Sequence, residues 1–233
     1  DILRLRREHE SFMRHELKNL LGPIKGFSDL LLMGGLEGLG EKQASFITRI
    51  SQATGAAVEL IDNLKKLQDI ESGSFDLETV PVDVAQVIAG RIDELGLAAR
   101  EQGVVIRLLN NAERTIVQGD PTLLPGVFLN VLKNAVEHVS GLEDRSQKTV
   151  EVVVDNKEDS VVIRVNNRGE PIPEGKLRTF FDKFNSDRRK KKEGMGLGTT
   201  YAWLVTRAHD GCIKVASNSM EGTTVTISLP VIM

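Results

Sequence analysis

The sequence predicts an α+β protein with two domains, a helical hairpin followed by an α/β sandwich in which helices cover one sheet. Two long stretches with apolar residues at three- and four-residue steps flank a glycine-rich break at residues 34–40, GGLEGLG. The pattern changes after Ser72-Gly73-Ser74, where β-branched runs begin to alternate with helical stretches. We therefore predict domains at residues 1–72 and 75–233.

The hairpin domain is expected to contain one helix over residues 1 to about 32 and another from about 41 to 70. Its apolar stripes comprise Phe12, Leu20, Ile24, Phe27 and Leu31 in the first helix, and Phe46, Ile50, Ala53, Ala57, Leu60, Leu64 and Leu67 in the second. A lone hairpin cannot bury both stripes, so we predict a homodimer that forms a four-helix bundle. The opening residues, DILRLRREHE, have no N-cap, which favours a helix that continues from upstream sequence.

The second domain is expected to alternate helices with strands. Helices are predicted at residues 82–102, 120–139 and after Gly198, and strands at residues 104–109, 149–154, 160–166, 213–217 and 223–229. Pro121 falls in the first turn of the helix predicted at 120–139, where proline costs little. Polar turn residues separate the runs 149–154 and 160–166, which predicts a pair of neighbouring strands.

The composition, 40% hydrophobic and 27% charged over 233 residues, is that of a globular protein. The net charge of −3 gives no electrostatic reason to bind nucleic acid. A single cysteine, Cys212, excludes an internal disulfide and fits a reducing compartment. No apolar run approaches the roughly 20 residues that cross a bilayer. We therefore expect a cytoplasmic protein, and leave open a membrane tether through an upstream region.

The first predicted helix carries the segment His15-Glu16-Leu17-Lys18-Asn19. An imidazole attacks a phosphoryl group when one ring nitrogen is unprotonated, and Glu16 is placed to hold the proton of the other. Asn19 lies one helical turn beyond His15, where its amide can orient a water molecule. The alternative is an ordinary charged helix surface, because the dipeptide His-Glu has little specificity.

The helix predicted at 120–139 carries Asn130, Asn134 and His138 at four-residue spacing, which puts them on one face. Asparagine is a poor helix former, so two in register need a reason. An amide oxygen suits Mg²⁺ that is held mainly by phosphates. The alternative is a solvated face with a hydrogen bond to a neighbouring helix.

Two glycine-containing loops follow. The segment Asn167–Pro173, NRGEPIP, comes directly after a predicted strand, and by itself indicates only a turn. The segment Gly194–Gly198 precedes a helix, where backbone N–H groups and the helix dipole suit phosphate oxygens, although a structural linker has the same pattern. Between them, Phe180–Phe184 is rich in phenylalanine, which usually indicates core. The basic run Arg188–Lys192 is either a solvated segment or a cover for a triphosphate.

In this order, the motifs resemble those of the sensor histidine kinases of two-component systems, over essentially the whole chain. That family joins a dimerising hairpin bearing a phospho-acceptor histidine to an ATP-binding domain of the type shared with Hsp90, MutL and gyrase B. The resembling segments are 15–19 for the H-box, 130–135 for the N-box, 181–184 for the F-box, and 167–173, 194–198 and 221–224 for the three glycine boxes.

The resemblance implies that ATP and Mg²⁺ are used to phosphorylate Nε2 of His15, with Glu16 as the acid–base partner and Asn134 as the Mg²⁺ ligand. It also implies phosphotransfer to an aspartate in the receiver domain of a response regulator, phosphatase activity toward that regulator through Asn19, and an upstream sensor domain outside this sequence. The residues expected at the nucleotide are Asn130, Asn134, His138, Asn167, Gly169, Phe184, Gly194, Gly196, Leu197, Gly198 and Thr224.

The sequence departs from the family pattern at several positions. Asn167 stands where an aspartate normally reads the adenine amino group, and its neutral oxygen predicts weaker nucleotide binding. Pro171 replaces a glycine of the same loop, and Glu137 replaces a frequent basic residue near the phosphates. In the H-box, Leu20 replaces a frequent proline, and Pro23 predicts a helix bend nearby. These departures leave an alternative, a weak or inactive pseudokinase scaffold that binds a response regulator. A third alternative is an ATPase or serine kinase of the same nucleotide-binding fold. It is disfavoured, because such proteins lack a helical hairpin that carries the motif His-Glu-x-x-Asn.

Overall fold

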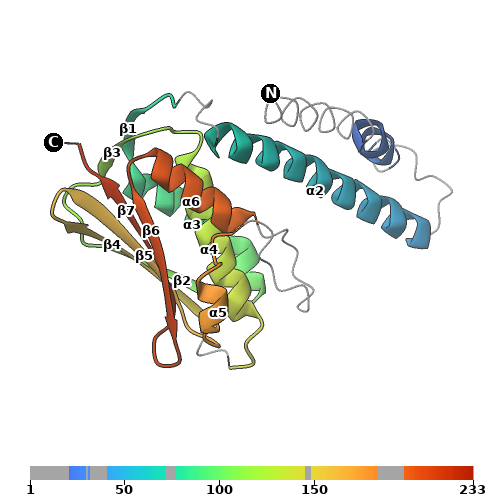
Figure 1. The fold of residues 1–233 in the computed structure, drawn as a ribbon. Coiled ribbons are helices and arrows are strands. Elements are labelled where there is room, and N and C mark those ends of the chain that lie inside the picture. The colour runs from blue at the N-terminus through green and yellow to red at the C-terminus, as the bar shows by residue number, and fades with distance from the viewer. Residues whose placement is uncertain are drawn as a thin grey trace. The chain divides into compact units, whose positions relative to one another are not determined.

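The computed structural model describes residues 21–29, 31, 41–71, 77–144, 148–182 and 197–232. The chain forms two compact units, Asp1–Asp69 and Ile70–Met233. Figure 1 labels their helices and strands. No helix in these ranges is both long and apolar enough to cross a membrane.

The first unit contains two helical segments. Residues 21–29 are helical, including Pro23, and α2 (Glu41–Glu71) is a helix of 31 residues. The second predicted helix is therefore confirmed. Most of the first predicted helix, at residues 1–20, and the glycine-rich break at 34–40 lie outside the described residues, as does the H-box with its expected bend.

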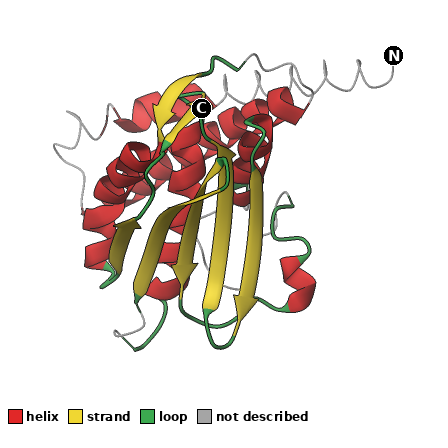
Figure 2. Ribbon diagram, turned by 90° about the vertical axis from the view of Figure 1, so that its left-hand side faces the viewer, coloured by secondary structure: helices red, strands yellow, loops and turns green. Residues whose placement is uncertain are grey.

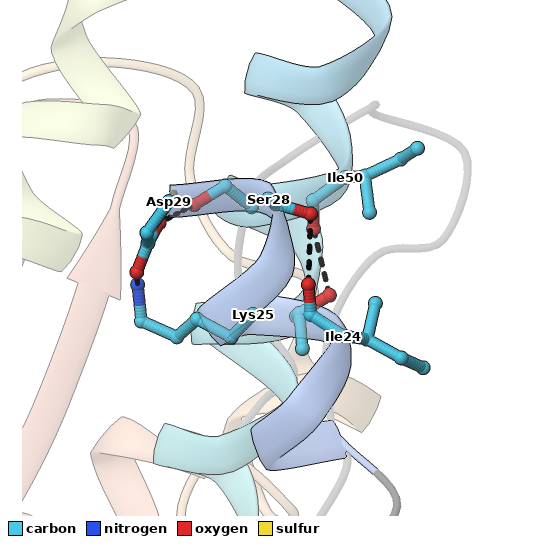
Figure 3. Close-up of polar contacts among 7 residues, drawn as sticks. Ile24, Lys25, Ser28, Asp29 and Ile50 are labelled. Carbon is cyan, nitrogen blue, oxygen red and sulfur yellow. Dashed lines mark hydrogen bonds and ion pairs between the residues drawn. The ribbon is translucent and has the colours of Figure 1, made fainter. Parts of the chain in front are cut away.

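A polar cluster joins the two helical segments of this unit (Figure 3). The carboxylate of Asp29 accepts a hydrogen bond from Nζ of Lys25 at 2.8 Å and another from Oγ of Ser51, on α2, at 2.5 Å. The bond from Lys25, and then that from Ser51, holds the pKa of Asp29 below its ordinary value of 3.8. Because a charged acceptor strengthens such bonds, the cluster favours one register of the two helices.

The core of the second unit is a five-stranded sheet of order β2-β4-β5-β7-β6. Its strands are β2 (Val105–Asn110), β4 (Thr149–Lys157), β5 (Ser160–Asn167), β6 (Cys212–Asn218) and β7 (Gly222–Pro230). β2 runs parallel to β4, and the other neighbours are antiparallel. All five correspond to predicted strands, and the predicted pairing of β4 with β5 is confirmed.

Three helices, α3 (Val84–Glu101), α4 (Leu124–Ser140) and α6 (Gly198–Ala208), lie on one face of this sheet (Figure 2). The burial of β5 alternates accordingly. Val161, Ile163 and Val165 are at most 3% exposed. The even-numbered residues between them are more exposed: Val162 is 8% exposed, and Arg164 and Asn166 are half-buried. Odd-numbered residues of β5 therefore face the helices, and the predicted architecture of one sheet covered by helices is confirmed.

Short elements account for the errors of the sequence-based prediction. β1 (Val80–Asp83) and β3 (Ile116–Gly119) form a separate antiparallel pair, and α5 (Glu174–Leu177) is a single helical turn. None was predicted, because four residues carry no measurable periodicity. The helix predicted from Val82 begins only at Val84, since Val82 belongs to β1 and Asp83 caps the helix.

The helix predicted from Asp120 begins only at Leu124, so Pro125 occupies the first turn instead of Pro121. Asp120 forms a hydrogen-bonded turn just ahead of the helix, whose N-cap residue is Leu123. Its Oδ1 accepts hydrogen bonds from the backbone and hydroxyl of Thr122 and from the backbone N–H of Leu123. An aspartate followed by proline is a helix-start signal in sequence, and it placed the predicted start one turn early.

Candidate functional site

A row of polar side chains runs along α4. Asn130, Asn134 and His138 follow one another at four-residue spacing, so the predicted shared face is confirmed. Asn134 is exposed, and the other two are half-buried. The buried side of α4 is apolar, with Val127 and Phe128 at most 2% exposed, and its packing fixes the rotation of the helix.

Asn130 lies against the first residue of α6. Its Nδ2 donates to the carbonyl of Gly126 at 2.8 Å. A Cβ added at Gly198 would lie only 2.5 Å from Oδ1 of Asn130. α6 thus begins directly beside the Asn130 amide, and it has no side-chain cap among the described residues. An uncapped helix N-terminus exposes backbone N–H groups that suit an anion.

Tyr201 holds this junction together. Its hydroxyl donates to the carbonyl of Leu123 at 3.1 Å, and its ring lies over Gly126, where an added Cβ would approach it to 2.8 Å. Burial, and secondarily the charge of Asp120, raises the pKa of Tyr201 to about 12, so the hydroxyl remains a donor. Leu197, just before α6, is buried at 6% exposure.

His138, at the other end of the row, contacts the loop that follows β5. Its Nε2 lies 3.1 Å from the carbonyl oxygen of Glu170. Since a carbonyl only accepts, Nε2 carries the proton of this bond. Gly169 has φ +149°, and a Cβ there would lie 2.9 Å from the imidazole. The positive φ gives one reason for glycine at this position, and the close approach gives a second.

Asn167, the last residue of β5, is buried beside this loop. It is 4% exposed and belongs to the helix-facing set of β5 residues. Its Nδ2 has no hydrogen-bond partner among the described residues. Its backbone pairs with Val150 on one side and Thr223 on the other, so the side chain projects from a fixed point of the sheet.

The two threonines after Gly222 face opposite sides of the sheet. Thr223 is 5% exposed, lies next to Asn167, and shares a hydrogen bond of 2.8 Å with Ser217. Thr224, the threonine that the sequence suggested, instead accepts a hydrogen bond from Asn166, which faces away from the helices. The structure therefore brings Thr223, and not Thr224, to Asn167. The apolar alternation of β7, in phase with Thr223, is the sequence signal that could have identified it.

Asp120 and His209 form a buried connection that sequence reasoning missed. The backbone N–H of Asp120 donates to Nε2 of His209 at 2.9 Å, which leaves the proton on Nδ1 for the carbonyl of Val205. Burial tends to raise the pKa of Asp120, but the hydrogen bonds from Thr122 and from backbone N–H groups outweigh it and hold the pKa below 3.8. This connection ties the start of α4 to the end of α6.

Several expected site residues lie outside the described residues, namely His15, Glu16, Asn19, Phe184, Gly194, Gly196 and the basic run 188–192. The described residues bring together two sets instead. One is Asn130 with Gly198, and the other is His138 with Gly169 near Asn167. Asn130 and His138 are eight positions apart on α4, which corresponds to about 12 Å of helix. The described part of the chain has no group of three or more His, Cys, Asp or Glu side chains that could hold a metal ion.

Comparison with known proteins identifies both units. Residues 5–73 match the His Kinase A (phospho-acceptor) domain family. Residues 119–232 match the family described as histidine kinase-, DNA gyrase B-, and HSP90-like ATPase, and so form an ATP-binding domain. These matches define a class of signalling enzyme that joins a phospho-acceptor hairpin to an ATPase-type fold.

The chain belongs to the sensor histidine kinases, as the resemblance predicted. It is 28% identical over 223 residues to the circadian input-output histidine kinase CikA of Synechococcus elongatus, covering 94% of this chain and 29% of CikA. It is 29% identical over 218 residues to sporulation kinase A of Bacillus subtilis, covering 93% and 33%. The chain thus spans about a third of the length of these relatives. Among solved structures, full-length ShkA in complex with AMPPNP has the same fold, with a TM-score of 0.81 at 19% identity over 97% of this chain and 46% of that one.

Proposed function

We propose that this chain is the catalytic core of a sensor histidine kinase that uses ATP and Mg²⁺ to phosphorylate its own His15. The main support is the α4 row. At one end Asn130 lies beside the start of α6, which has no side-chain cap among the described residues, and at the other end His138 contacts the loop that follows the buried Asn167. A nucleotide needs both features, because its phosphates are anionic and its base has a hydrogen-bonding edge. His15 supplies the acceptor, within the segment that matches the phospho-acceptor family.

The triphosphate would lie at the N-terminus of α6, beside Asn130 and the glycines Gly194, Gly196 and Gly198. The base would lie at Asn167, whose oxygen accepts from the amino group of adenine. His138 and Gly169 position the loop next to the base. Leu197 supports the start of α6 from the core. Phe184 is proposed to border the nucleotide from the segment before α6. Thr223 replaces Thr224 as the neighbour of Asn167 in this arrangement.

The residues present suit Mg²⁺ bound mainly by phosphate oxygens. Asn134 is exposed on the same face as Asn130, and its amide oxygen is a hard ligand. Bound there, the ion would neutralise charge on the phosphates. Asn134→Ala should therefore remove the Mg²⁺ dependence of nucleotide binding. Titration with and without Mg²⁺ checks this, and an unchanged Mg²⁺ dependence would contradict the role.

In the proposed transfer, Nε2 of His15 attacks the γ-phosphorus. A P–N bond forms, the bond to the β–γ bridging oxygen breaks, and ADP leaves with the electron pair. Glu16 takes the proton from Nδ1, which keeps the imidazole nucleophilic. Transfer of this kind depends on positioning and charge neutralisation more than on covalent chemistry. The basic run 188–192 is a proposed source of further positive charge.

The deciding experiment incubates the protein with radiolabelled ATP and Mg²⁺. We expect acid-labile label on the wild type and none on His15→Ala, which should still bind ATP. His9→Ala, a histidine change in the same predicted helix, is the matched control and should label normally. Equal labelling of the His15→Ala protein would refute the assignment.

We further propose that the phosphoryl group passes to an aspartate of a response regulator, and that Asn19 holds the water that later hydrolyses it. Asn19→Ala should keep autophosphorylation near wild type and slow regulator dephosphorylation at least tenfold, about 1.4 kcal/mol of barrier. A parallel loss of both activities would show that Asn19 has no separate role.

The partner of the hairpin is proposed to be a second copy of this chain. Five stripe residues remain between 41% and 67% exposed, namely Ile24, Phe27, Leu31, Phe46 and Ile50. Large apolar side chains exposed at helical spacing on one hairpin favour burial against another helix pair. Sedimentation at micromolar concentration should give a dimer, and a monomer would contradict the proposal. The sensor domain is proposed to lie upstream of this sequence.

A pseudokinase scaffold remains the second candidate, because two departures from the family pattern affect the proposed nucleotide site. Asn167 is neutral at the base, and Glu137 places a half-buried acid one turn beyond Asn134 on α4. A negative charge there opposes phosphate binding. A wild-type protein that binds a receiver domain but shows no labelled histidine would favour this candidate.

A further inference from the structure

The buried amide of Asn167 offers more than an acceptor. A side-chain amide presents one acceptor and, next to it, a donor group. Asn167 is 4% exposed, and its Nδ2 has no partner among the described residues. Buried N–H groups are nearly always hydrogen-bonded in folded proteins, so an unpaired one indicates a missing partner. A bound ligand is the simplest source of that partner.

The neighbouring polar groups are already engaged. Thr223, the cross-strand neighbour of Asn167, shares its hydroxyl hydrogen bond with Ser217. Ser217 in turn accepts from the backbone N–H of Ile172 at 2.9 Å. The hydroxyls beside Asn167 therefore have their own partners, and they hold the loop after β5 in place.

The backbone of Asn167 cannot move to find another partner. The residue is paired in the sheet on both sides, with Val150 and with Thr223. The carbonyl oxygen of Asn167 also packs against Gly222, which has φ +78° and where an added Cβ would collide with that oxygen. A half-turn of the side-chain amide about its last torsion exchanges donor and acceptor without any movement of the backbone.

Purine bases present matching pairs of groups. The edge of adenine carries an amino donor at position 6 next to the acceptor N1. A 6-oxopurine such as hypoxanthine carries the reverse, an acceptor O6 next to the donor N1–H. An amide pairs with either edge by a half-turn of its plane, whereas a carboxylate only accepts and is repelled by O6.

We propose that Asn167 makes this site accept 6-oxopurine nucleoside triphosphates as well as ATP. The inference rests on the proposed function, because it requires the base to lie at Asn167. In the ATP complex Nδ2 donates to N1, and in the inosine triphosphate (ITP) complex the amide turns so that Nδ2 donates to O6. Both complexes satisfy the buried N–H group.

The test measures binding of four nucleotides to the wild-type chain by calorimetry with Mg²⁺. ITP is expected to bind within tenfold of ATP. 1-Deaza-ATP, which lacks the N1 acceptor, is expected to bind at least fivefold more weakly than ATP. 7-Deaza-ATP carries the same type of change on the opposite edge of the base, so it is the matched control and should bind as ATP does.

The variant Asn167→Asp gives a second, independent measurement. Its carboxylate should raise the preference for ATP over ITP at least tenfold relative to wild type, which corresponds to about 1.4 kcal/mol. Asn110→Asp is the control, since Asn110 is exposed at the end of β2 and its Oδ1 accepts from Ala112, a bond that a carboxylate retains. It should leave the preference unchanged. If Asn167→Asp does not fold, the nucleotide series on the wild type still decides.

The outcomes separate this inference from the proposed function. In one outcome the wild type binds ATP tightly and labels His15, but it binds ITP more than tenfold more weakly than ATP and binds 1-deaza-ATP as well as ATP. This outcome overturns the inference and leaves the kinase proposal standing. An Asn167→Asp protein with the wild-type preference also overturns it. Failure of the wild type to bind ATP overturns both.

Discussion

Replacing Gly198 by alanine places a methyl group 2.5 Å from Oδ1 of Asn130 and 3.1 Å from its Cγ. Ordinary contact requires the asparagine to retreat by roughly 1 Å. It cannot do so freely, because its Nδ2 is bonded to the carbonyl of Gly126 at 2.8 Å. The substitution therefore breaks that bond or displaces the start of α6, and both changes distort the proposed phosphate end of the site.

The magnitudes predict little change in stability and a clear loss of binding. A lost hydrogen bond costs about 1 kcal/mol, whereas alanine in place of glycine in a helix contributes about 0.5–1 kcal/mol. The free energy of unfolding of Gly198→Ala should thus stay within about 1 kcal/mol of wild type. The affinity for ATP should fall at least fivefold, since about 1 kcal/mol at the site corresponds to roughly that factor.

Urea unfolding and calorimetric titration with ATP and Mg²⁺ measure the two quantities on the same protein. Gly175→Ala is the matched control, because Gly175 lies in α5 and an added Cβ there meets nothing within 4 Å. Wild-type affinity in Gly198→Ala would refute the role of the Asn130–Gly198 contact. A loss of affinity that merely follows a loss of folded protein would refute it as well.

Three further predictions concern stability. Tyr201→Phe removes the bond to the carbonyl of Leu123 and should lower the free energy of unfolding by about 1 kcal/mol, measured by urea denaturation. Asp29 has a lowered pKa in the folded state, so its stability contribution is present above pH 3.8 and is lost as the pH falls through the folded-state pKa. The difference in melting temperature between wild type and Asp29→Asn should therefore shrink as the pH falls below 3.8. A constant difference between pH 7 and about pH 3 would contradict the proposed cluster. Gly169→Ala introduces strain at φ +149° and a contact of 2.9 Å with His138. It should therefore destabilise the fold by about 1–3 kcal/mol in the same urea assay. An unchanged urea midpoint would contradict this prediction.

Local patterns predicted much of the second unit. The β-branched runs of β4 and β5 and the shared face of Asn130, Asn134 and His138 follow from periodicities of 2 and 3.6 residues, which any short window of sequence contains. The apolar residues of β7 also recur at every second position. The helix starts were less well predicted, because Asp120 and Asp83 act through a few local hydrogen bonds that leave no periodic trace.

The residue pattern was enough to predict the order of the motifs, the family that they resemble and the row of side chains on α4. Which of these residues meet depends on how the unit folds. Gly198 reaches Asn130, and Gly169 reaches His138, because the sheet order and helix packing bring distant segments together. The same packing leaves Nδ2 of Asn167 buried without a partner in the part of the chain that the structure describes, and turns Thr224 to the other face. Periodicity is a property of neighbouring residues, whereas contact and burial depend on the whole folded unit.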